Sequence, residues 1–389
     1  MQLSSSFSSI LVSVLFAVTL SDRSCAVPTE HPAAQNSSSG LDVHSYASRS
    51  THQLIVRAPE PITVPLRNIG KDQAYYASLF IGGNPRPFNL LADSGSHDLW
   101  VFSETSPQRG NHNGIGPASS PQSFVNQNRA WSTGYEDGQG INGAVFTDNV
   151  FIGNKGISGM VMGTAEVVSE DIAESREDGI LGLATGRFSR TGGLTLLDSL
   201  VQAGIIPEAV TGWKLSRKAD GLNDGEIVLG GVNSNLFDAN TRITVPNIDT
   251  TDGGFKVALG GIAANNAWIV GPSIGIFDSG TTDITVHPTI AQRLHAQIPG
   301  AELNDDGEYI IPCNTQTVFI VSIGNVGWPI DARDLAFDTV PGRPGYCVSN
   351  IQADEDREAN EILLGGTFLK NVYQILDKGR GQIGLARLR

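Results

Sequence analysis

Two stretches of the chain place an aspartate directly after an apolar, strand-like run. The first is "LLADSGSHDLWVF", which contains Asp93, and the second is "IGIFDSGTTDITV", which contains Asp278. A carboxylate at the end of a buried strand is costly unless a partner or a reaction uses its charge. One Asp-Ser-Gly tripeptide indicates only a turn, because all three residues favour turns. Two copies in matching contexts indicate a shared site.

Two carboxylates brought together predict general acid–base chemistry. Both cannot ionise cheaply, so the pair holds one proton between its members. One carboxylate can then deprotonate a water while the protonated partner assists a substrate carbonyl. Gly95 and Gly280 permit tight turns, and the hydroxyls of Ser96 and Thr281 can hydrogen-bond the outer carboxylate oxygens. The pattern predicts peptide hydrolysis without a metal or a covalent intermediate.

The two halves of the chain repeat a longer pattern. Each has a strand that leads into Asp-Ser-Gly, and each has a later segment in which apolar residues precede a glycine, "DGILGLA" at 178–184 and "EILLGGTF" at 361–368. The simplest architecture is two related lobes that each contribute one aspartate to a shared cleft. We expect an N-terminal lobe over 67–240 and a C-terminal lobe over 241–389.

The composition favours β structure. Hydrophobic residues make up 40% of the chain, charged residues 17%, and 45 residues are glycine. Strand-like runs such as "YYASLFIGG" are short and bounded by turn residues, and helical patterns appear mainly at 194–204 and 288–298. These features predict an all-β fold with minor helices. His287 and His295 flank the second helix and are expected at the surface.

The formal net charge is −14. An acidic body argues against nucleic acid as a partner, because phosphates would be repelled. It is compatible with work at low pH, where carboxylates lose part of their charge, and simple solubility is an equally good explanation.

The N-terminus carries targeting and processing signals. The apolar run at 10–20 is too short to span a bilayer and precedes small residues, so 1–26 is interpreted as a secretory signal peptide. The alternative is an unprocessed core segment. The stretch 27–66 is rich in Pro, Ser and Ala and is interpreted as a pro-region that ends between Arg57 and Arg67. No later stretch could span a membrane.

Cysteine and histidine usage bear on redox state and metals. On the signal-peptide interpretation Cys25 is removed, so Cys313 and Cys347 remain as a pair in an oxidising compartment. We expect them to form a disulfide, with two buried free thiols as the alternative. The seven His show no metal-ligand spacing, and we expect neither a metal nor a cofactor.

A literal G-x-G-x-x-G occurs at Gly138, Gly140 and Gly143. In a dinucleotide-binding fold this motif would open a helix. Here the strand-like "AVFTDNVFI" follows, so the motif is interpreted as the tip of a hairpin.

Taken together, these motifs resemble the pepsin family of aspartic proteases, especially its secreted fungal members, from about Tyr75 to the C-terminus. The two Asp-Ser-Gly segments resemble the family's active-site motifs, and "WSTGYEDGQGINGAVFTDNVFIG" resembles its flap hairpin. "IPCNT" and "GYCVSNIQ" place Cys313 and Cys347 like the disulfide of the family's C-terminal lobe. The resemblance implies a bilobal double β-barrel or sandwich with an inter-lobe active-site cleft.

The resemblance also implies an activity, that of an aspartic endopeptidase with an acidic pH optimum, made as a zymogen. Asp93 and Asp278 would be the catalytic dyad, and Ser94 and Ser279 would cross-link the two turns. Such an enzyme acts on proteins or peptides and binds neither nucleic acid nor membrane. We expect a monomer that is secreted or held in an acidic, vacuole-like compartment.

Further roles are implied for the flap. Tyr135 would close over the substrate and hydrogen-bond Trp100. Asp137 lies where some fungal relatives hold an Asp that lets a Lys fit beside the scissile bond, and Gly138 would belong to the same substrate-binding segment.

Four residues depart from the family pattern. Glu136 replaces a common Gly, and Gln139 replaces a small hydroxyl residue. His97 stands where Ser is typical, and Asp283 occupies a position that is usually apolar. We favour an Asp283 that points to solvent or pairs locally over one that raises the proton affinity of the dyad.

The rival interpretation is a catalytically inactive, pepsin-like secreted binding or inhibitor protein. Such relatives usually lose one Asp turn or the flap tyrosine. Asp93, Asp278 and Tyr135 are all present here, which favours the enzyme.

Overall fold

The computed structural model describes residues 58–135, 140–185, 188–249, 253–305 and 307–389. Within these ranges the chain is mostly β-strand, and no helix is long and apolar enough to cross a membrane. The expected signal peptide and most of the expected pro-region lie outside the described residues.

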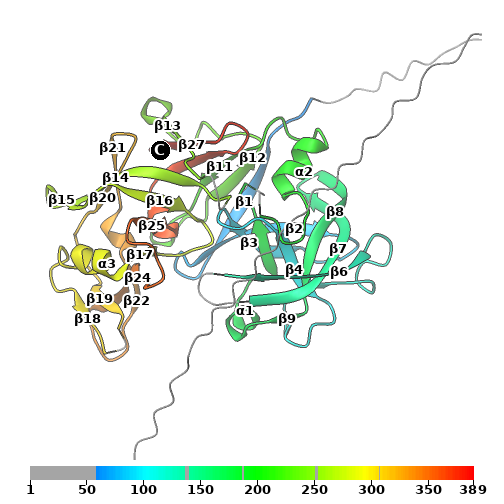
Figure 1. The fold of residues 1–389 in the computed structure, drawn as a ribbon, viewed down its shortest axis with the longest axis horizontal. Helices are drawn as coiled ribbons and strands as arrows, with labels where there is room; N and C mark the ends of the chain where they lie inside the picture. The colour runs from blue at the N-terminus through cyan, green and yellow to red at the C-terminus, as the bar shows by residue number, and fades with distance from the viewer. Residues whose placement is uncertain (1–57, 136–139, 186–187, 250–252, 306) are drawn as a thin grey trace, which may run out of the picture. The chain divides into compact units, whose positions relative to one another are not determined.

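The largest sheet has fifteen strands (Figure 1). Its members are β1 (Ile62–Ile69), β2 (Ala74–Ile81), β3 (Phe88–Asp93), β4 (Leu99–Ser103), β5 (Gly114–Ile115), β6 (Val125–Gly134), β7 (Gly140–Ile152), β8 (Lys155–Ala165), β9 (Val167–Val168), β10 (Gly179–Gly182), β11 (Val210–Lys214), β12 (Gly225–Leu229), β13 (Ile243–Pro246), β26 (Tyr373–Asp377) and β27 (Gln382–Ala386).

Two smaller sheets come from the second half of the chain. The eight-stranded sheet contains β14 (Lys256–Ala264), β15 (Ala267–Val270), β16 (Ser273–Phe277), β17 (Ile284–Val286), β20 (Ile320–Ile323), β21 (Val326–Pro329), β24 (Ile351–Ala353) and β25 (Glu361–Leu364). The four-stranded sheet contains β18 (Glu302–Leu303), β19 (Tyr309–Pro312), β22 (Ala336–Thr339) and β23 (Tyr346–Ser349).

The described helices are few and short. They are α1 (Glu170–Glu174), α2 (Leu196–Gln202), α3 (Pro288–His295), α4 (Gly366–Leu369) and the 3-10 turns η1 (Lys218–Asp220), η2 (Ala239–Thr241) and η3 (Ala332–Asp334). Thr195 caps α2 by accepting a hydrogen bond from the Asp198 N–H. A proline opens α3 at its first position. The prediction of an all-β fold with minor helices is confirmed.

The internal repeat appears as one strand arrangement built twice. In the first half β10 lies between β3 and β4, parallel to β3 and antiparallel to β4. In the second half β25 lies between β16 and β17 with the same directions. The central strand of each set belongs to the apolar segment in which a glycine follows the apolar residues, Gly182 in the first half and Gly365 in the second. The buried Leu90, Leu181, Phe277 and Leu364 show why these runs are apolar.

The large sheet draws strands from both halves of the chain. β26 pairs with β11, and β13 pairs with β27. β1 begins at Ile62, inside the stretch expected as a pro-region, and pairs with β12 over five residues. Ile62, Val64 and Leu66 of β1 are buried in the core, so this strand is an integral part of the sheet.

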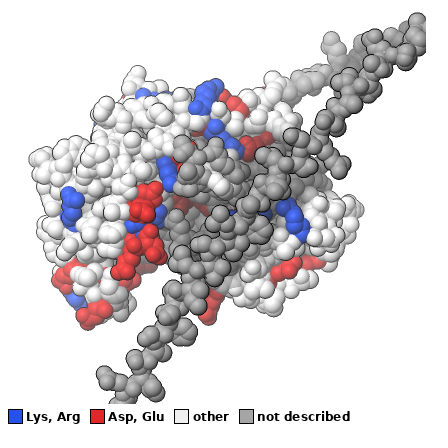
Figure 2. Space-filling model, in the orientation of Figure 1, with Lys and Arg blue, Asp and Glu red and all other residues white. Residues whose placement is uncertain are grey.

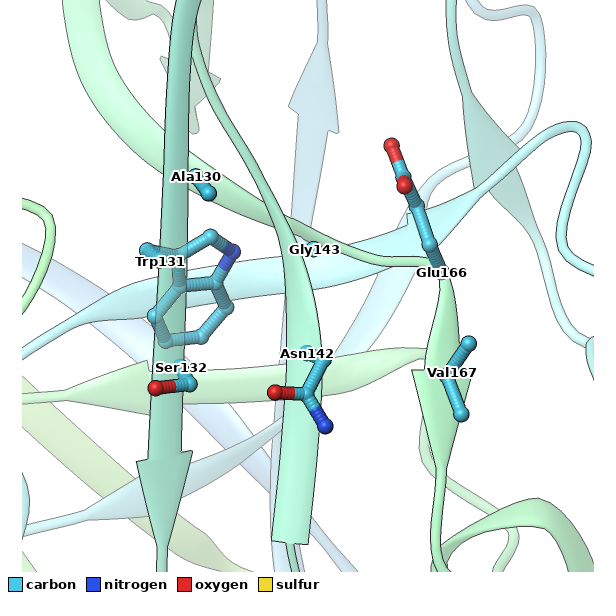
Figure 3. A pocket seen from close by; sticks show the side chains of 7 residues that line it. All are labelled: Ala130, Trp131, Ser132, Asn142, Gly143, Glu166 and Val167. Atoms are coloured by element: carbon cyan, nitrogen blue, oxygen red, sulfur yellow. The ribbon is translucent and has the colours of Figure 1, made fainter.

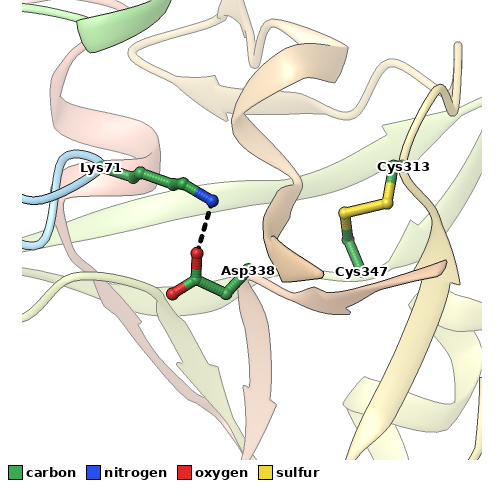
Figure 4. The surroundings of a disulfide bond; sticks show 4 residues. All are labelled: Lys71, Cys313, Asp338 and Cys347. Carbon is green, nitrogen blue, oxygen red and sulfur yellow. Dashed lines mark hydrogen bonds and ion pairs between the residues drawn. A yellow bond between two sulfur atoms is a disulfide. The ribbon is translucent and has the colours of Figure 1, made fainter. Parts of the chain in front are cut away.

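Cys313 and Cys347 form a disulfide with a Cα–Cα distance of 5.0 Å, which confirms the predicted bond (Figure 4). Nearby, Lys71 and Asp338 form an ion pair at 2.6 Å, but both side chains are more than half exposed. Such a pair contributes little to stability in water.

The surface position expected for His295 is wrong. Its side chain is 3% exposed and stacks on the ring of Tyr309, with centroids 3.7 Å apart. One ring nitrogen bonds the Ala291 carbonyl, and the other bonds the Ser349 hydroxyl. Burial lowers the pKa of His295 to about 4. The buried side of α3 therefore includes its last residue, His295, although a polar side chain at this position suggested exposure.

Candidate active site

The two predicted aspartates lie at the ends of equivalent strands. Asp93 is the last residue of β3, paired with Gly182 of β10. Asp278 directly follows β16, and its N–H donates to the Leu364 carbonyl of β25. The repeated strand set therefore holds both carboxylates by backbone hydrogen bonds.

The glycines of the two turns face each other's carboxylates. A Cβ added at Gly95 would lie 2.6 Å from Asp278 Oδ1, and one added at Gly280 would lie 2.6 Å from Asp93 Oδ1. Real Cβ atoms do not approach oxygen this closely, so only glycine leaves room for the opposite acid. The structure thus brings Asp93 and Asp278 together.

Ser94 and Ser279 cross-link the turns. The Ser94 N–H donates to Ser279 Oγ at 3.0 Å, and the Ser279 N–H donates to Ser94 Oγ at 2.9 Å. The Ser279 hydroxyl in turn donates to the Ala92 carbonyl at 2.8 Å, and the Ser94 hydroxyl donates to the Phe277 carbonyl at 3.3 Å. Both serines are buried. The cross-link satisfies polar groups that would otherwise be orphaned.

Each aspartate also accepts hydrogen bonds from its own turn. The Gly95 N–H donates to Asp93 Oδ1 at 2.7 Å, and the Gly280 N–H donates to Asp278 Oδ1 at 2.8 Å. The Thr281 hydroxyl donates to Asp278 Oδ2 at 2.6 Å.

The residue equivalent to Thr281 behaves differently. The Ser96 hydroxyl is close enough to Asp93 to favour the charged carboxylate, but it is buried without a hydrogen bond of normal length and angle to any described residue.

Burial dominates the electrostatics of the pair. Asp93 is 5% exposed. This burial, followed by the charge of Asp278, raises the pKa of Asp93 well above its ordinary value. Two carboxylates this close hold one proton between them at acidic and near-neutral pH. The arrangement can supply an acid and a base at once.

The predicted aromatic contact lies beside the first turn. The Trp100 Nε1–H donates to Tyr135 Oη at 2.7 Å. Trp100 lies in β4 and is 2% exposed, so it is a fixed anchor for the hydroxyl of Tyr135, which follows β6. Glu136, Asp137, Gly138 and Gln139 lie outside the described residues.

Two departures from the family pattern can be placed. Asp283 Oδ1 accepts a hydrogen bond from the Thr285 hydroxyl at 3.0 Å, which is the local pairing that we favoured. Burial raises the pKa of Asp283, and the charge of Asp278 adds to this. His97 lies edge-on to Phe188 with ring centroids 6.2 Å apart, and burial lowers its pKa.

Sequence reasoning missed a buried ionic network near the second turn. Lys370 Nζ lies 2.9 Å from Asp72 Oδ2 and 3.3 Å from Asp334 Oδ1, and Arg217 binds Asp334 through two nitrogens at 2.8 Å each. Burial alone would raise the pKa of Asp72, but Lys370 and neighbouring hydrogen bonds outweigh it and lower the pKa. These residues are far apart in the chain, and no local motif marks them.

Asp72 lies in the turn between β1 and β2, and a second contact joins this turn to the segment that follows Asp278. The Thr282 hydroxyl donates to the Gln73 carbonyl at 2.7 Å, and Gln73 directly follows Asp72. The β1–β2 turn of the first half therefore supports the backbone that carries the second aspartate.

A shallow pocket of about 340 Å³ lies on the β6–β7 hairpin (Figure 3). Ser132, Asn142 and Val167 line it from three neighbouring strands, β6, β7 and β9. Its lining includes neither Asp93 nor Asp278. The candidate active site is therefore defined by the paired acids and not by this hollow.

Charged side chains are sparse on the face drawn in Figure 2. They form small groups, and in some of these acidic and basic side chains lie side by side. This fits a chain with 17% charged residues.

Comparison with known proteins agrees with this geometry. A family model of eukaryotic aspartyl proteases matches residues 74–388. Rhizopuspepsin from Rhizopus chinensis is 29% identical over 83% of this chain and 81% of its own length. Syncephapepsin from Syncephalastrum racemosum is 27% identical over 83% of this chain and 80% of its own length. The aspartic-type endopeptidase ctsD of Aspergillus fumigatus is 27% identical over 89% and 73%. The chain belongs to the eukaryotic aspartyl protease family.

Proposed function

We propose that this aspartic endopeptidase uses Asp93 and Asp278 together to activate a water molecule for the hydrolysis of peptide bonds. The observation that carries the proposal is the pair of Asp-Ser-Gly turns in which each glycine leaves space for the opposite carboxylate. A carboxylate pair that shares one proton contains both groups that the reaction needs.

In the proposed reaction the charged carboxylate takes a proton from water as the water oxygen bonds to the scissile carbonyl carbon. The protonated carboxyl gives its proton to the carbonyl oxygen. In the second step the C–N bond breaks, and the amide nitrogen receives the proton first taken from water. The oxygen-bound proton returns to the pair, so the products are a carboxylic acid and an amine.

The neighbouring residues are assigned supporting roles. Hydrogen bonds from Gly95, Gly280 and Thr281 would orient the carboxylates, and Ser94 and Ser279 would hold the turns together. Ser96 is the counterpart of Thr281 on the first turn.

The hairpin residues are assigned to substrate binding. Trp100 would fix the hydroxyl of Tyr135, whose ring would then pack over the substrate. Asp137 and Gly138 are included from the family resemblance alone, with Asp137 as acceptor for a basic side chain.

The enzyme acts on protein or peptide substrates. We further propose that it works as a monomer, binds neither nucleic acid nor membrane, and is secreted or held in an acidic vacuole-like compartment. A signal peptide at 1–26 accounts for this destination.

We propose maturation by removal of a pro-region that starts at residue 27. The pairing of β1 with β12 and the burial of Ile62 support a cut before Ile62, earlier than the boundary at 66 that the sequence suggested. On this proposal the N-terminal lobe gains β1 and runs to about 240, and the C-terminal lobe covers 241–389.

Digestion of a denatured protein at about pH 3 to 5 tests the function. The matured chain should cleave it, and a statine-type peptide should block the cleavage. A folded, matured chain that binds the statine-type peptide but cleaves nothing would favour the inactive binding protein. N-terminal sequencing of the mature form tests the cut before Ile62.

A further inference from the structure

The side chain of Asp98 is bound from one direction by a single loop. Asp98 Oδ1 accepts hydrogen bonds from the Ser189 hydroxyl at 2.7 Å, the Thr191 hydroxyl at 2.6 Å and the Thr191 N–H at 3.3 Å. Its Oδ2 accepts from the Arg190 N–H at 2.7 Å. These bonds anchor the loop 189–193 to the segment that follows Asp93.

The same loop lies against the β6–β7 hairpin. The Arg129 guanidinium of β6 donates to the Thr191 carbonyl. Arg190 lines a cavity of about 380 Å³ together with Ser132, Thr133 and Gly134 at the end of β6. Among the described strands β6 pairs with β7 alone, and Tyr135 follows its last residue. The loop is therefore a bridge between Asp98 and the strand that leads to Tyr135.

The 189–193 loop also packs against strand β8 of the large sheet. A Cβ added at Gly193 would lie 2.8 Å from Val161 Cβ of β8. Gly193 therefore packs closely against β8, and the rest of the 189–193 loop is held by Asp98 on one side and by Arg129 on the other.

The repeat supplies an internal control. Asp283 stands five residues after Asp278, as Asp98 stands five residues after Asp93. The backbone carbonyls of the two residues accept equivalent hydrogen bonds. Asp98 O accepts from the Gly182 N–H at 3.1 Å, and Asp283 O accepts from the Gly365 N–H at 3.0 Å. The Asp283 side chain, however, accepts from Thr285 two residues away and binds no described loop.

We propose that Asp98 is a positioning residue that sets the β6–β7 hairpin, and with it Tyr135, relative to the Asp93 turn. It acts through the 189–193 loop and Arg129. The consequence is control of substrate affinity with little effect on the chemical step. This inference rests on the proposed function for its kinetic meaning, whereas the tether itself can be measured without any activity.

The primary test compares Asp98→Asn with Asp283→Asn in the matured protein. An amide at position 98 keeps one acceptor and places its NH2 group against one backbone N–H, that of Arg190 or of Thr191, so the hold on the loop should weaken. We expect D98N to raise KM about tenfold with kcat within about twofold and an unchanged pH profile, and D283N to leave KM within about twofold. A fall in kcat at constant KM, or equal effects of the two variants, would overturn the proposal.

A double-mutant cycle tests the route through Arg129. Arg129→Ala should raise KM by a similar factor, and D98N/R129A should be no worse than the stronger single variant, because both break the same tether. Partial rescue by Arg129→Lys is expected. Independent, multiplying effects on KM would show that Asp98 does not act through the loop.

An activity-independent readout separates this proposal from the proposed function. Hydrogen exchange of the β6 amides should be faster in D98N than in wild type and unchanged in D283N. If wild type cleaves nothing, the proposed function fails, while faster β6 exchange in D98N still supports the tether. If D98N does not fold, Ser189→Ala with Thr191→Val removes the two hydroxyl donors and should give the same exchange result. Unchanged β6 exchange in the folded variant would refute the tether.

Discussion

The turn after Asp93 and the turn after Asp278 share their backbone chemistry. In each, the glycine two residues on donates to the aspartate, at 2.7 Å and 2.8 Å. In each, the serine N–H donates to the hydroxyl of the opposite serine, at 3.0 Å and 2.9 Å. The side chains around this common frame differ. Thr281 bonds Asp278, whereas Ser96 bonds nothing among the described residues.

This contrast teaches that a symmetric frame holds an asymmetric pair. Asp93 is the more buried member, and its raised pKa follows from burial and from the charge of Asp278. Thr281 supplies a hydrogen bond to the carboxylate of Asp278. Asp98 extends the asymmetry outward, because its side chain binds the 189–193 loop, whereas the side chain of Asp283 binds no loop among the described residues.

The largest effect should come from removing either acid. Asp93→Asn and Asp278→Asn keep the shape of the side chain but leave a single carboxylate, which cannot act as base and acid in the same step. Each variant should therefore lower kcat by about a thousandfold or more. Asp356→Asn, on an exposed loop, is the matched control. Digestion assays on folded protein measure this, and a variant that keeps more than about a tenth of the wild-type rate would rule out the shared-proton mechanism.

The next largest effect concerns stability against pH. The pKa of Asp93 is raised in the fold, so the folded state binds a proton that the unfolded chain has lost. This contribution is fully present below about pH 4 and disappears as the pH rises through the raised pKa, with a slope of at most about 1.4 kcal/mol per pH unit. The thermal unfolding temperature should fall less steeply between pH 4 and pH 7 in D93N than in wild type or D356N. Parallel curves would contradict the coupling.

Local patterns explain why much of this frame could be predicted. Strand-like runs before Asp93 and Asp278, turn residues after them and the apolar segments ending at Gly182 and Gly365 are short-range signals, and they recur. The fold class and the Cys313–Cys347 bond were confirmed. The meeting of the two acids follows from the repeat, since equivalent strand sets end in equivalent turns.

Long-range polar contacts could not be predicted. Lys370 and Asp72 are 298 residues apart and find each other only through the tertiary fold. His295 looked like a surface residue because its type is polar, yet its ring is used as packing surface against Tyr309. The loop that binds Asp98 carries ordinary turn residues, and nothing in their order marks the acid they serve.

A smaller effect is expected from the cross-linking serines. Ser94→Ala and Ser279→Ala each leave a buried N–H of the opposite turn without its acceptor, at a cost of about 1–3 kcal/mol. Ser279→Ala should cost more, because its hydroxyl makes the shorter bond to a carbonyl, 2.8 Å against 3.3 Å. Urea unfolding checks this, with the exposed Ser78→Ala as control. Equal costs would mean that the cross-link is as symmetric as its backbone.

The smallest effect is expected from the hydroxyls of Thr281 and Ser96, which should differ in how much each contributes to kcat/KM. Thr281→Val keeps the shape of the side chain but removes the donor to Asp278 Oδ2, so kcat/KM should fall about threefold to tenfold, in line with the loss of a hydrogen bond to a charged group. Ser96→Ala removes a hydroxyl that has no described partner and should change kcat/KM less than about twofold. Rates at one acidic pH for both folded variants decide the matter. If Ser96→Ala falls as far as Thr281→Val, the first aspartate is supported as the second one is, and the asymmetry of the pair must then come from burial alone.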